Sequence, residues 1–582
     1  MGKQLAVNVA AGGLKATGCC TPKEDKTPQK MSVPPRRVLP IIFIPGIMGS
    51  NLRMSAKRQE ELKKSNNIAW RPDFKYESSG LLNASPRERQ LQLDPSTTEV
   101  DEYDPPNSST GDKKETPEDR NKIGTVSVTL NVGINTPLLT DDLKGSKNGK
   151  TKEEKARERG WGEIYCGSYQ GILEKCEQHL NSPPTSDFWK KMFEVDPVRW
   201  GAHPEPALKR LSENDFKKAV EGCWFPVHAM GYNWLEANGD SALKLGNRII
   251  KLIKKYREQK FQCEKVILIT HSMGGLVARA LIHPKLGKLS SEILGIVHGE
   301  MPAAGAPAAY KRIRSGTEES GSIIDFAPKI LGNFGSDVTA VLGNAQGGLE
   351  LLPSKAYGNG WLEIRQNGKL LRSLPENGDP YAEIYQIRDK WWRLLREEWL
   401  NPALQPGCGF DHTYILLEQA KEFHELINSS YHDLCYAHYG CDSGRPSWEK
   451  VIWNLDPKYK EKDWQGLHIF SDEKKGKFRL YKATSDFIDD EDSGIASMDG
   501  TNINIPPQYP SFGVELGASV GPGDQTVPAR SSDQQLHSGK FSGLFRQVGY
   551  EHQNSYKDDA AIKSTLFSLV RIIEKMKWSN HA

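Results

Sequence analysis

Short apolar runs of strand type alternate with amphipathic helical segments along much of the chain. Runs rich in Ile, Val and Leu occupy residues 38–44, 265–270 and 293–298. Between the first two, residues 242–260 repeat apolar side chains at helical spacing and carry Lys and Arg on the opposite side. Buried strands separated by such helices are typical of a parallel sheet covered on both faces. We therefore expect an α/β core with a mostly parallel sheet.

The pattern changes outside these runs. Residues 1–38 are expected to form a flexible N-terminal arm, and residues 56–160 a polar insertion rich in Ser, Thr, Asp, Lys and Pro. Residues 306–505 hold amphipathic segments without a regular alternation of strands, which favours a large, mainly helical cap or lid over the core. The core is then assembled from residues 39–55, 161–305 and 506–582.

One segment of the expected cap, residues 381–400, combines a helical pattern with several Trp side chains. Trp391, Trp392 and Trp399 fit the core of a cap, which is the favoured interpretation. They also fit a lid that faces lipid, because Trp is common at membrane interfaces. The second interpretation would make the cap a peripheral membrane contact.

Composition narrows the class of protein. The chain has 582 residues, which allow one to three domains, and its net charge of +3 gives no dedicated nucleic-acid surface. No run reaches the roughly 18 apolar residues of a membrane span. The N-terminal residues lack the uninterrupted apolar stretch of a signal peptide. We therefore expect synthesis in the cytoplasm without a classical signal peptide.

The strongest local signal lies at residues 266–276, which read VILITHSMGGL. A strand run stops near Thr270 and a helical pattern starts at Gly275, with Ser272 at the turn between them. A Ser at the tip of a strand–turn–helix unit is typical of a nucleophile elbow. Thr270 stands where the usual G-x-S-x-G motif has its first Gly, so the prediction depends on the context of the motif.

A nucleophilic Ser needs a base, and the base needs an orienting acid. In α/β-hydrolases the acid and the His follow the Ser in that order along the chain. Asp524 lies in the turn Gly-Asp-Gln-Thr-Val-Pro after an expected strand at 513–516, and His552 follows before an expected last helix at 560–577. The sequence therefore predicts a catalytic triad of Ser272, Asp524 and His552.

Acyl transfer also needs backbone N–H groups that bind the oxyanion. Met273, directly after the nucleophile, is expected to supply one of them. The loop after the first strand is expected to supply the other, from Met48 or alternatively from Ile47. His271 lies within the elbow and is assigned a packing role. This chemistry needs no metal and no organic cofactor.

Two clusters invite a metal-site hypothesis. Cys435, His438 and Cys441 suggest zinc, but their spacing fits no standard finger, and ordinary loop residues or one disulfide are favoured. The acidic run 489–492 suggests Ca²⁺ but lacks the spaced oxygens of a known binding loop. We expect no metal site.

Three segments together resemble the lecithin–cholesterol acyltransferase superfamily of lipases. They are residues 44–50 (IPGIMGS), 270–275 (THSMGG) and 523–528 (GDQTVP), the last combined with His552. Within that superfamily the chain is most similar to the fourth family of bacterial type VI secretion lipase effectors. This likeness rests on the chain length, on residues 159–162 (RGWG) and on residues 232–235 (YNWL).

The resemblance implies an α/β-hydrolase fold and a phospholipase A that cleaves acyl esters of membrane glycerophospholipids as an antibacterial effector. It also implies secretion by a type VI machine into the periplasm of target cells, contact with a component of that machine, and a cognate inhibitor (immunity) protein. Two alternatives remain open. One is an acyltransferase of the same superfamily, and the other is a catalytically inactive hydrolase fold that binds a partner.

Overall fold

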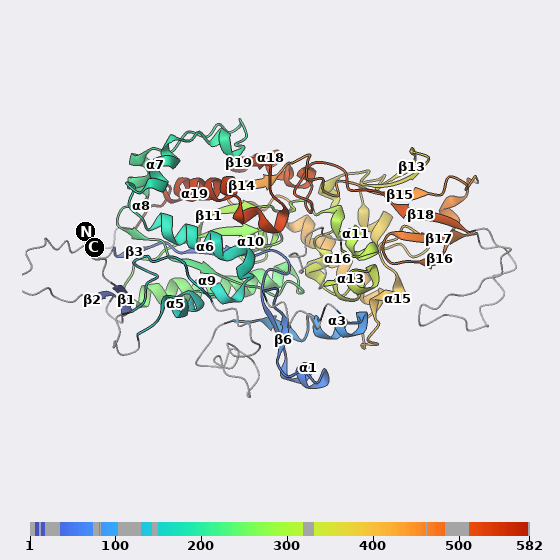
Figure 1. Cartoon of the computed structure of the whole chain (residues 1–582), viewed down its shortest axis with the longest axis horizontal. Coiled ribbons are helices and arrows are strands. Elements are labelled where there is room, and N and C mark those ends of the chain that lie inside the picture. Colours follow the sequence, from blue (N-terminus) through green and yellow to red (C-terminus); the bar gives the residue numbers. More distant parts are fainter. Residues whose placement is uncertain are drawn as a thin grey trace, which may run out of the picture.

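Two six-stranded β-sheets organise the molecule, one in each half of its long axis (Figure 1). The first sheet carries the core of the fold, and the second belongs to the cap. Every helix in the described part of the chain is too short or too polar to span a lipid bilayer. The computed structural model describes residues 6–10, 13–17, 35–73, 81, 83–102, 130–142, 149–317, 331–460, 462–482 and 511–579.

The core sheet is parallel throughout and has the strand order β19-β14-β11-β10-β4-β9. Every residue of β4, β9, β10, β11 and β14 is buried, as expected for strands that are covered on both faces. The prediction of a mostly parallel sheet is confirmed. The strands span Ile41–Ile44 (β4), Val227–Ala229 (β9), Val266–His271 (β10), Ile293–Gly299 (β11), Cys435–Gly440 (β14) and Phe541–Gln547 (β19).

Helices cover both faces because strand side chains alternate between two hydrophobic clusters. Ile42 and Leu268 join the cluster that contains α9 and α10, whereas their neighbours Ile41 and Ile267 join the cluster that contains α6 and α19. This alternation has the period of two that defines a β-strand. The four helices span Cys166–Leu180 (α6), Asn238–Glu258 (α9), Gly274–Ile282 (α10) and Asp559–Ile573 (α19).

Two insertions into the core build the cap. The chain leaves the core after β11 and again after β14, and strands from both excursions pair in one sheet of order β13-β12-β15-β18-β17-β16. The parallel pair β12–β15 joins the two excursions, and the other pairs are antiparallel. The strands span Leu362–Gln366 (β12), Lys369–Leu374 (β13), Val451–Leu455 (β15), His468–Asp472 (β16), Lys477–Tyr481 (β17) and Phe512–Leu516 (β18). The main cap helices span Pro307–Ser315 (α11), Gly335–Leu342 (α13) and Phe410–Ile427 (α16).

The structure departs from the predicted domain boundaries at two strands. Residues 435–440 fall in the predicted cap but form β14 in the middle of the core sheet. Their sequence, CYAHYG, lacks the Ile and Val of the other core strands, so no local pattern marks the return to the core. The strand predicted at 513–516 forms as β18, but it belongs to the cap sheet.

The Trp-rich segment 381–400 does not form one helix. Tyr381–Tyr385 (η5) is a short π-helical turn and Glu397–Leu400 (α15) a single α-helical turn, with irregular backbone between them. Neighbours on a helix point about 100° apart, so irregular backbone allows Trp391 and Trp392 to turn inward together. The interpretation as a lipid-facing Trp lid is wrong, because these side chains form the core of the cap. The exposed fractions are 1% for Trp391, 2% for Trp392 and 6% for Trp399.

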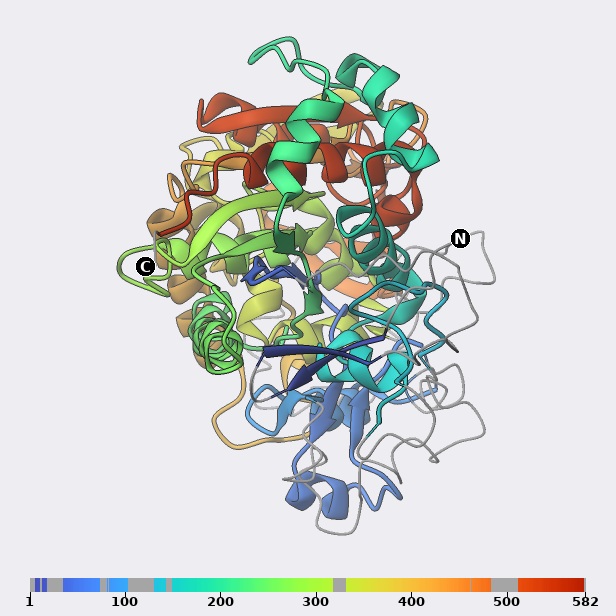
Figure 2. The ribbon, with the colours of Figure 1, turned by 90° about the vertical axis from the view of Figure 1, so that its left-hand side faces the viewer.

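The N-terminal segments hold more structure than the sequence predicts. Two strands pair as an antiparallel hairpin inside the expected arm, and a three-stranded sheet of order β6-β5-β7 connects to the expected polar insertion. Figure 2, which views the molecule from one end, shows this small blue sheet below the core. The acidic run 489–492 lies outside the described residues. The strands span Ala6–Ala10 (β1), Gly13–Thr17 (β2), Leu52–Met54 (β5), Ile68–Trp70 (β6) and Thr98–Val100 (β7).

Candidate active site

The predicted elbow joins β10 to α10. Ser272 has a φ of 51°, a left-handed conformation that is strained for a residue with a side chain and common at functional turns. Its N–H donates to the carbonyl of Gly299, 2.8 Å away, which anchors the turn to β11. A Cβ atom at Gly274 would lie 2.4 Å from the carbonyl oxygen of Pro45. Only glycine at 274 therefore lets the helix start this close to the loop after β4.

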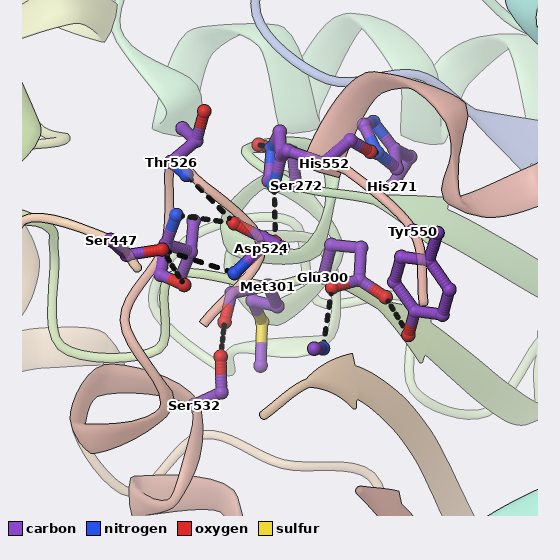
Figure 3. Close-up of polar contacts among 12 residues, drawn as sticks. His271, Ser272, Glu300, Met301, Ser447, Asp524, Thr526, Ser532, Tyr550 and His552 are labelled. Carbon is purple, nitrogen blue, oxygen red and sulfur yellow. Dashed lines mark hydrogen bonds and ion pairs between the residues drawn. The ribbon is translucent and has the colours of Figure 1, made fainter. Parts of the chain in front are cut away.

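The structure brings the three predicted triad residues together from distant segments (Figure 3). His552 Nε2 lies 2.8 Å from Ser272 Oγ, and His552 Nδ1 lies 2.7 Å from Asp524 Oδ2. The other carboxylate oxygen of Asp524 accepts the N–H groups of Thr526 at 3.0 Å and of Val527 at 2.6 Å. These two bonds orient the carboxylate toward the imidazole.

Electrostatics keep Asp524 ionised. Burial alone would raise the pKa of this carboxyl, but the charge and hydrogen bond of His552, helped by Glu300 and the N–H of Val527, hold the pKa below its usual value. A carboxylate can only accept, so His552 carries its proton on Nδ1 and leaves Nε2 free to accept the proton of Ser272. This arrangement is that of a general base beside a nucleophile.

His271 makes polar contacts that the predicted packing role does not include. Its Nε2 lies 2.9 Å from the carbonyl oxygen of His552, and its Nδ1 lies 2.9 Å from the hydroxyl of Tyr169. Burial, with the nearby charge of His552, lowers the pKa of His271 to about 3, so the ring is neutral. Because a carbonyl only accepts, Nε2 carries the hydrogen and Tyr169 donates to Nδ1. His271 therefore holds the turn that carries His552.

The loop after β4 forms a tight turn beside Ser272. The N–H of Gly49 donates to the carbonyl of Gly46 at 3.0 Å, and Met48 in the turn has a φ of 61°. Trp70 Nε1 donates to the carbonyl of Met48 at 2.8 Å and holds this strained residue in place. A Cβ atom at Gly46 would lie 2.9 Å from the Cβ of Ser272, so the turn packs directly against the elbow.

Three backbone N–H groups in these two turns remain available to a ligand. Those of Ile47, Met48 and Met273 donate no hydrogen bond to another residue in the described part of the chain. Backbone donors without an internal partner, next to a nucleophile, are suited to bind an oxyanion. The assignment of Met48 and Met273, with Ile47 as the alternative, stays a prediction.

Glu300 is a buried acid beside the predicted triad and is not among the predicted site residues. It directly follows β11, is 0% exposed and has a φ of 51°. Its carboxylate accepts the N–H of Gly440 and the hydroxyl of Tyr550, both at 2.8 Å. A signal was present, because Glu300 ends the strand next to the nucleophile strand, and parallel strands bring their carboxyl ends to the same edge of a sheet.

One group of side chains in the described residues is close enough to share a metal ion. Glu300, Asp524 and His552 bring their potential ligand atoms within 4.8 Å of one another. The contact between His552 and Asp524 has the 2.7 Å length of a hydrogen bond, and the imidazole also contacts Ser272. We therefore assign Asp524 and His552 to proton transfer with Ser272.

The hypotheses of a zinc site and of a disulfide at Cys435 and Cys441 are both wrong. Cys435 begins β14 and Cys441 directly follows its end, so the two lie roughly 20 Å apart at the rise of a strand. A disulfide requires Cα atoms within about 7 Å. His438 lies between them in the buried strand and places its Nδ1 3.2 Å from Glu300.

Comparisons with known proteins agree with this geometry. The family described as PGAP1-like alpha/beta domain matches residues 236–315, which contain α9, the elbow and β11. A chain in the crystal structure of the Tle4–Tli4 complex matches with a TM-score of 0.70 and 28% sequence identity, over 93% of this chain and 99% of that chain. None of the curated proteins is similar to the chain at a significant level.

The chain has an α/β-hydrolase fold, and these similarities support a hydrolase of the lipase type. Its resemblance to the type VI secretion lipase effectors is confirmed, because Tle4 is such an effector and the likeness extends over nearly the full length of both chains. The predicted fold class, an α/β-hydrolase core with a large, mainly helical cap insertion, is confirmed as well, and the cap also holds a six-stranded sheet that was not predicted.

Proposed function

We propose that this α/β-hydrolase is a phospholipase A that cleaves acyl esters of membrane glycerophospholipids. The observation that carries the proposal is the hydrogen-bonded series Ser272–His552–Asp524 at a nucleophile elbow. Serine in this setting forms an acyl-enzyme with carboxylic esters. The likeness to a lipase effector supports a lipid ester as the substrate.

In the proposed mechanism, Ser272 Oγ attacks the acyl carbonyl carbon while His552 Nε2 takes its proton. Asp524 stabilises the imidazolium that forms. The N–H groups of Met48 and Met273 bind the oxyanion, and a missing donor of this kind typically costs about 10²–10³-fold in rate. His552 then protonates the departing lysophospholipid oxygen, and a water molecule hydrolyses the acyl-enzyme through the same base.

Product analysis on phosphatidylethanolamine with two different acyl chains tests the reaction. We expect release of one fatty acid and the matching lysophospholipid from vesicles, and no release by Ser272→Ala. Hydrolysis confined to short soluble esters would contradict the lipid substrate. Transfer of the acyl group to an added alcohol at low concentration, instead of to water, would identify an acyltransferase.

A fluorophosphonate probe tests the nucleophile independently of the substrate. We expect labelling of the native chain and of Ser429→Ala, an exposed serine on the cap that serves as the matched control. Ser272→Ala should not be labelled. If the native chain is not labelled, or if Ser272→Ala is labelled equally well, the assignment of Ser272 fails and an inactive binding fold becomes the better interpretation.

We also propose that the enzyme acts as an antibacterial effector that a type VI machine delivers to the periplasm of target cells, and that an immunity protein inhibits it. The likeness to a chain of the Tle4–Tli4 complex supports both points. Expression in a susceptible bacterium should be toxic when the chain is exported to the periplasm. Toxicity that persists in Ser272→Ala, or that appears only in the cytoplasm, would contradict this proposal.

Peripheral membrane contact through the cap remains part of the proposal, on side chains other than the buried Trp residues. Leu404, Tyr414 and Ile415, on α16 and the loop before it, are 78%, 41% and 55% exposed. Exposed apolar side chains insert favourably into a lipid interface. Ile415→Lys should weaken binding to phospholipid vesicles and leave hydrolysis of a soluble ester unchanged, and equal vesicle binding would refute the contact.

A further inference from the structure

Glu300 lies behind the triad at a strained position. It is fully buried, its φ of 51° is left-handed, and its N–H donates to the carbonyl of His438 at 3.0 Å. Non-glycine residues persist in this conformation only where the surrounding structure holds them, and such residues cluster at functional sites. The proposed mechanism gives Glu300 no role, although its carboxyl shares a site with Asp524 and His552.

The groups around the Glu300 carboxyl are almost all neutral. Gly440 N–H and Tyr550 hydroxyl donate to its two oxygens, each at 2.8 Å. The only basic partner among the ion pairs of the described residues is His438, whose Nδ1 lies 3.2 Å away. Burial lowers the pKa of His438 to about 3 and raises that of Tyr550, so neither group is charged near neutral pH. The ionised group in this cluster is the carboxyl of Asp524, which lies within 4.8 Å.

These surroundings determine which carboxyl carries a proton. Burial raises the pKa of Glu300 far above its usual value, and the charge of Asp524 raises it further. One oxygen of each carboxyl lies within 4.8 Å of the other, and a hydrogen bond between the two carboxyls raises the pKa of whichever donates it and lowers that of its partner, here Glu300 and Asp524 respectively. Two carboxylates this close do not both ionise, so the proton resides on Glu300.

We propose that Glu300 is a positioning residue, whose neutral carboxyl donates a hydrogen bond to Asp524 and fixes that carboxylate against His552. The inference rests on the proposed catalytic function. The hydrogen bond satisfies a buried lone pair of Asp524 without adding a second negative charge. An ionised Glu300 would instead repel the carboxylate of Asp524. Its negative charge would also stabilise the protonated form of His552, which would slow proton transfer to the leaving group.

Two substitutions separate this role from a purely structural one. Glu300→Gln keeps a neutral side chain of the same shape, with an N–H that can donate to Asp524 and an oxygen that can accept from Gly440. Glu300→Met fills the space without a donor. We expect Gln to retain activity within about 3-fold, and Met to lower kcat about 10- to 100-fold with little change in KM, the range for a hydrogen bond to a charged group.

The dependence of kcat/KM on pH distinguishes the proposed role from a packing role, because a loss of packing alone would not shift the acid limb of the profile. Without the donor, Asp524 binds the His552 proton more tightly, so the acid limb of the kcat/KM profile should shift to higher pH in Glu300→Met. The limb should stay in place in Glu300→Gln. If Gln is as inactive as Met, Glu300 acts in its ionised form, and if Met equals the native enzyme, Glu300 has no positioning role. Either result overturns the proposal.

Difference infrared spectroscopy tests the proton without any catalytic assay. The difference spectrum between the native chain and Glu300→Gln near neutral pH should contain the carbonyl stretching band of one protonated carboxylic acid, and the band of the buried Glu350 should cancel because both chains carry it. A difference spectrum without that band overturns the proposal even if catalysis proves correct. A band that is present in a chain without esterase activity would instead refute the proposed function and leave the protonation state of Glu300 intact.

A milder variant guards against misfolding of Glu300→Met. Tyr550→Phe removes a hydroxyl that lies 2.8 Å from the Glu300 carboxyl and 3.0 Å from Gln547, while the ring stays in place. We expect a smaller loss of kcat than in Glu300→Met, with a shift of the acid limb in the same direction. Thermal unfolding of all variants reports whether each one is folded. A folded Tyr550→Phe with an acid limb moved to lower pH would contradict the proposal.

Discussion

Replacement of Asp524 by Asn tests the proposed triad most directly, because the structure dictates how the new amide must lie. One oxygen of Asp524 accepts two backbone N–H groups, from Thr526 at 3.0 Å and Val527 at 2.6 Å. An amide nitrogen cannot occupy that place, because it would face two donors. The Asn oxygen therefore takes it, and the Asn NH₂ group faces His552.

This orientation reverses the protonation of the imidazole. Facing a donor, His552 Nδ1 must become an acceptor, so its proton moves to Nε2. Nε2 lies 2.8 Å from Ser272 Oγ and would then donate to the nucleophile instead of accepting its proton. A triad with the wrong tautomer loses about 10⁴-fold in kcat, or about 5 kcal/mol of transition-state stabilisation.

Steady-state hydrolysis of a soluble ester and the rate of fluorophosphonate labelling both measure this loss. The matched control is Asp196→Asn, an aspartate distant in sequence that is half exposed and caps a short helix. We expect the control to keep native rates and both variants to keep native thermal unfolding. A folded Asp524→Asn that retains more than about a tenth of the activity would refute the reasoning, since another group would then orient His552.

Three further predictions follow from local geometry. Gly274→Ala should lower the free energy of unfolding, measured by thermal unfolding, by about 1–3 kcal/mol, because its Cβ would lie 2.4 Å from a backbone oxygen. Gly171→Ala on α6 is the matched control, since a Cβ there would have no atom within 4 Å, and it should not destabilise the fold. Tyr169→Phe should lower kcat about 3- to 10-fold with KM unchanged, since it removes the hydroxyl that orients His271; an unchanged kcat would count against that role. Burial raises the pKa of Glu350 from 4.5 to about 8, so the folded state binds this proton more tightly than the unfolded state does. The free energy of unfolding should therefore decline as the pH rises from 4.5 to about 8, by at most about 5 kcal/mol. Glu350→Gln should flatten this decline in denaturant titrations, and an equal decline in the variant would disprove the assignment.

The core could be predicted from sequence because its signals are local. The strands Val266–His271 and Ile293–Gly299 are continuous apolar runs, and the helix Asn238–Glu258 has a clear amphipathic period. The sequence placed Ser272, Asp524 and His552 in the chain order that is characteristic of the fold, and the structure brings the three side chains together. The strand and helix signals depend on neighbouring residues and the triad hypothesis on chain order, so neither needed knowledge of distant contacts.

The cap sheet and Glu300 escaped prediction for the opposite reason. Leu362 pairs with Val451, so the strand order depends on contacts between two separate insertions. Short strands such as β13, with mostly half-exposed side chains, carry little hydrophobic pattern of their own. The position of Glu300 after an apolar strand indicates the carboxyl edge of the sheet, but its burial depends on Tyr550 and Gly440, which come from distant segments.

The second insertion connects the cap to Asp524, the proposed catalytic acid. The chain leaves the core at Asp442 and returns at Gly523, and the two residues pair through N–H to carbonyl bonds of 3.1 and 3.3 Å. Asp524 is the next residue, and its N–H donates to Ser447 Oγ, which in turn donates to the carbonyl of Val527. Residues on both sides of the second insertion thus hold Asp524 in position. Strands β15 to β18 of the cap sheet lie between these residues in the chain. We therefore expect that misfolding of the cap sheet would also displace Asp524 from His552.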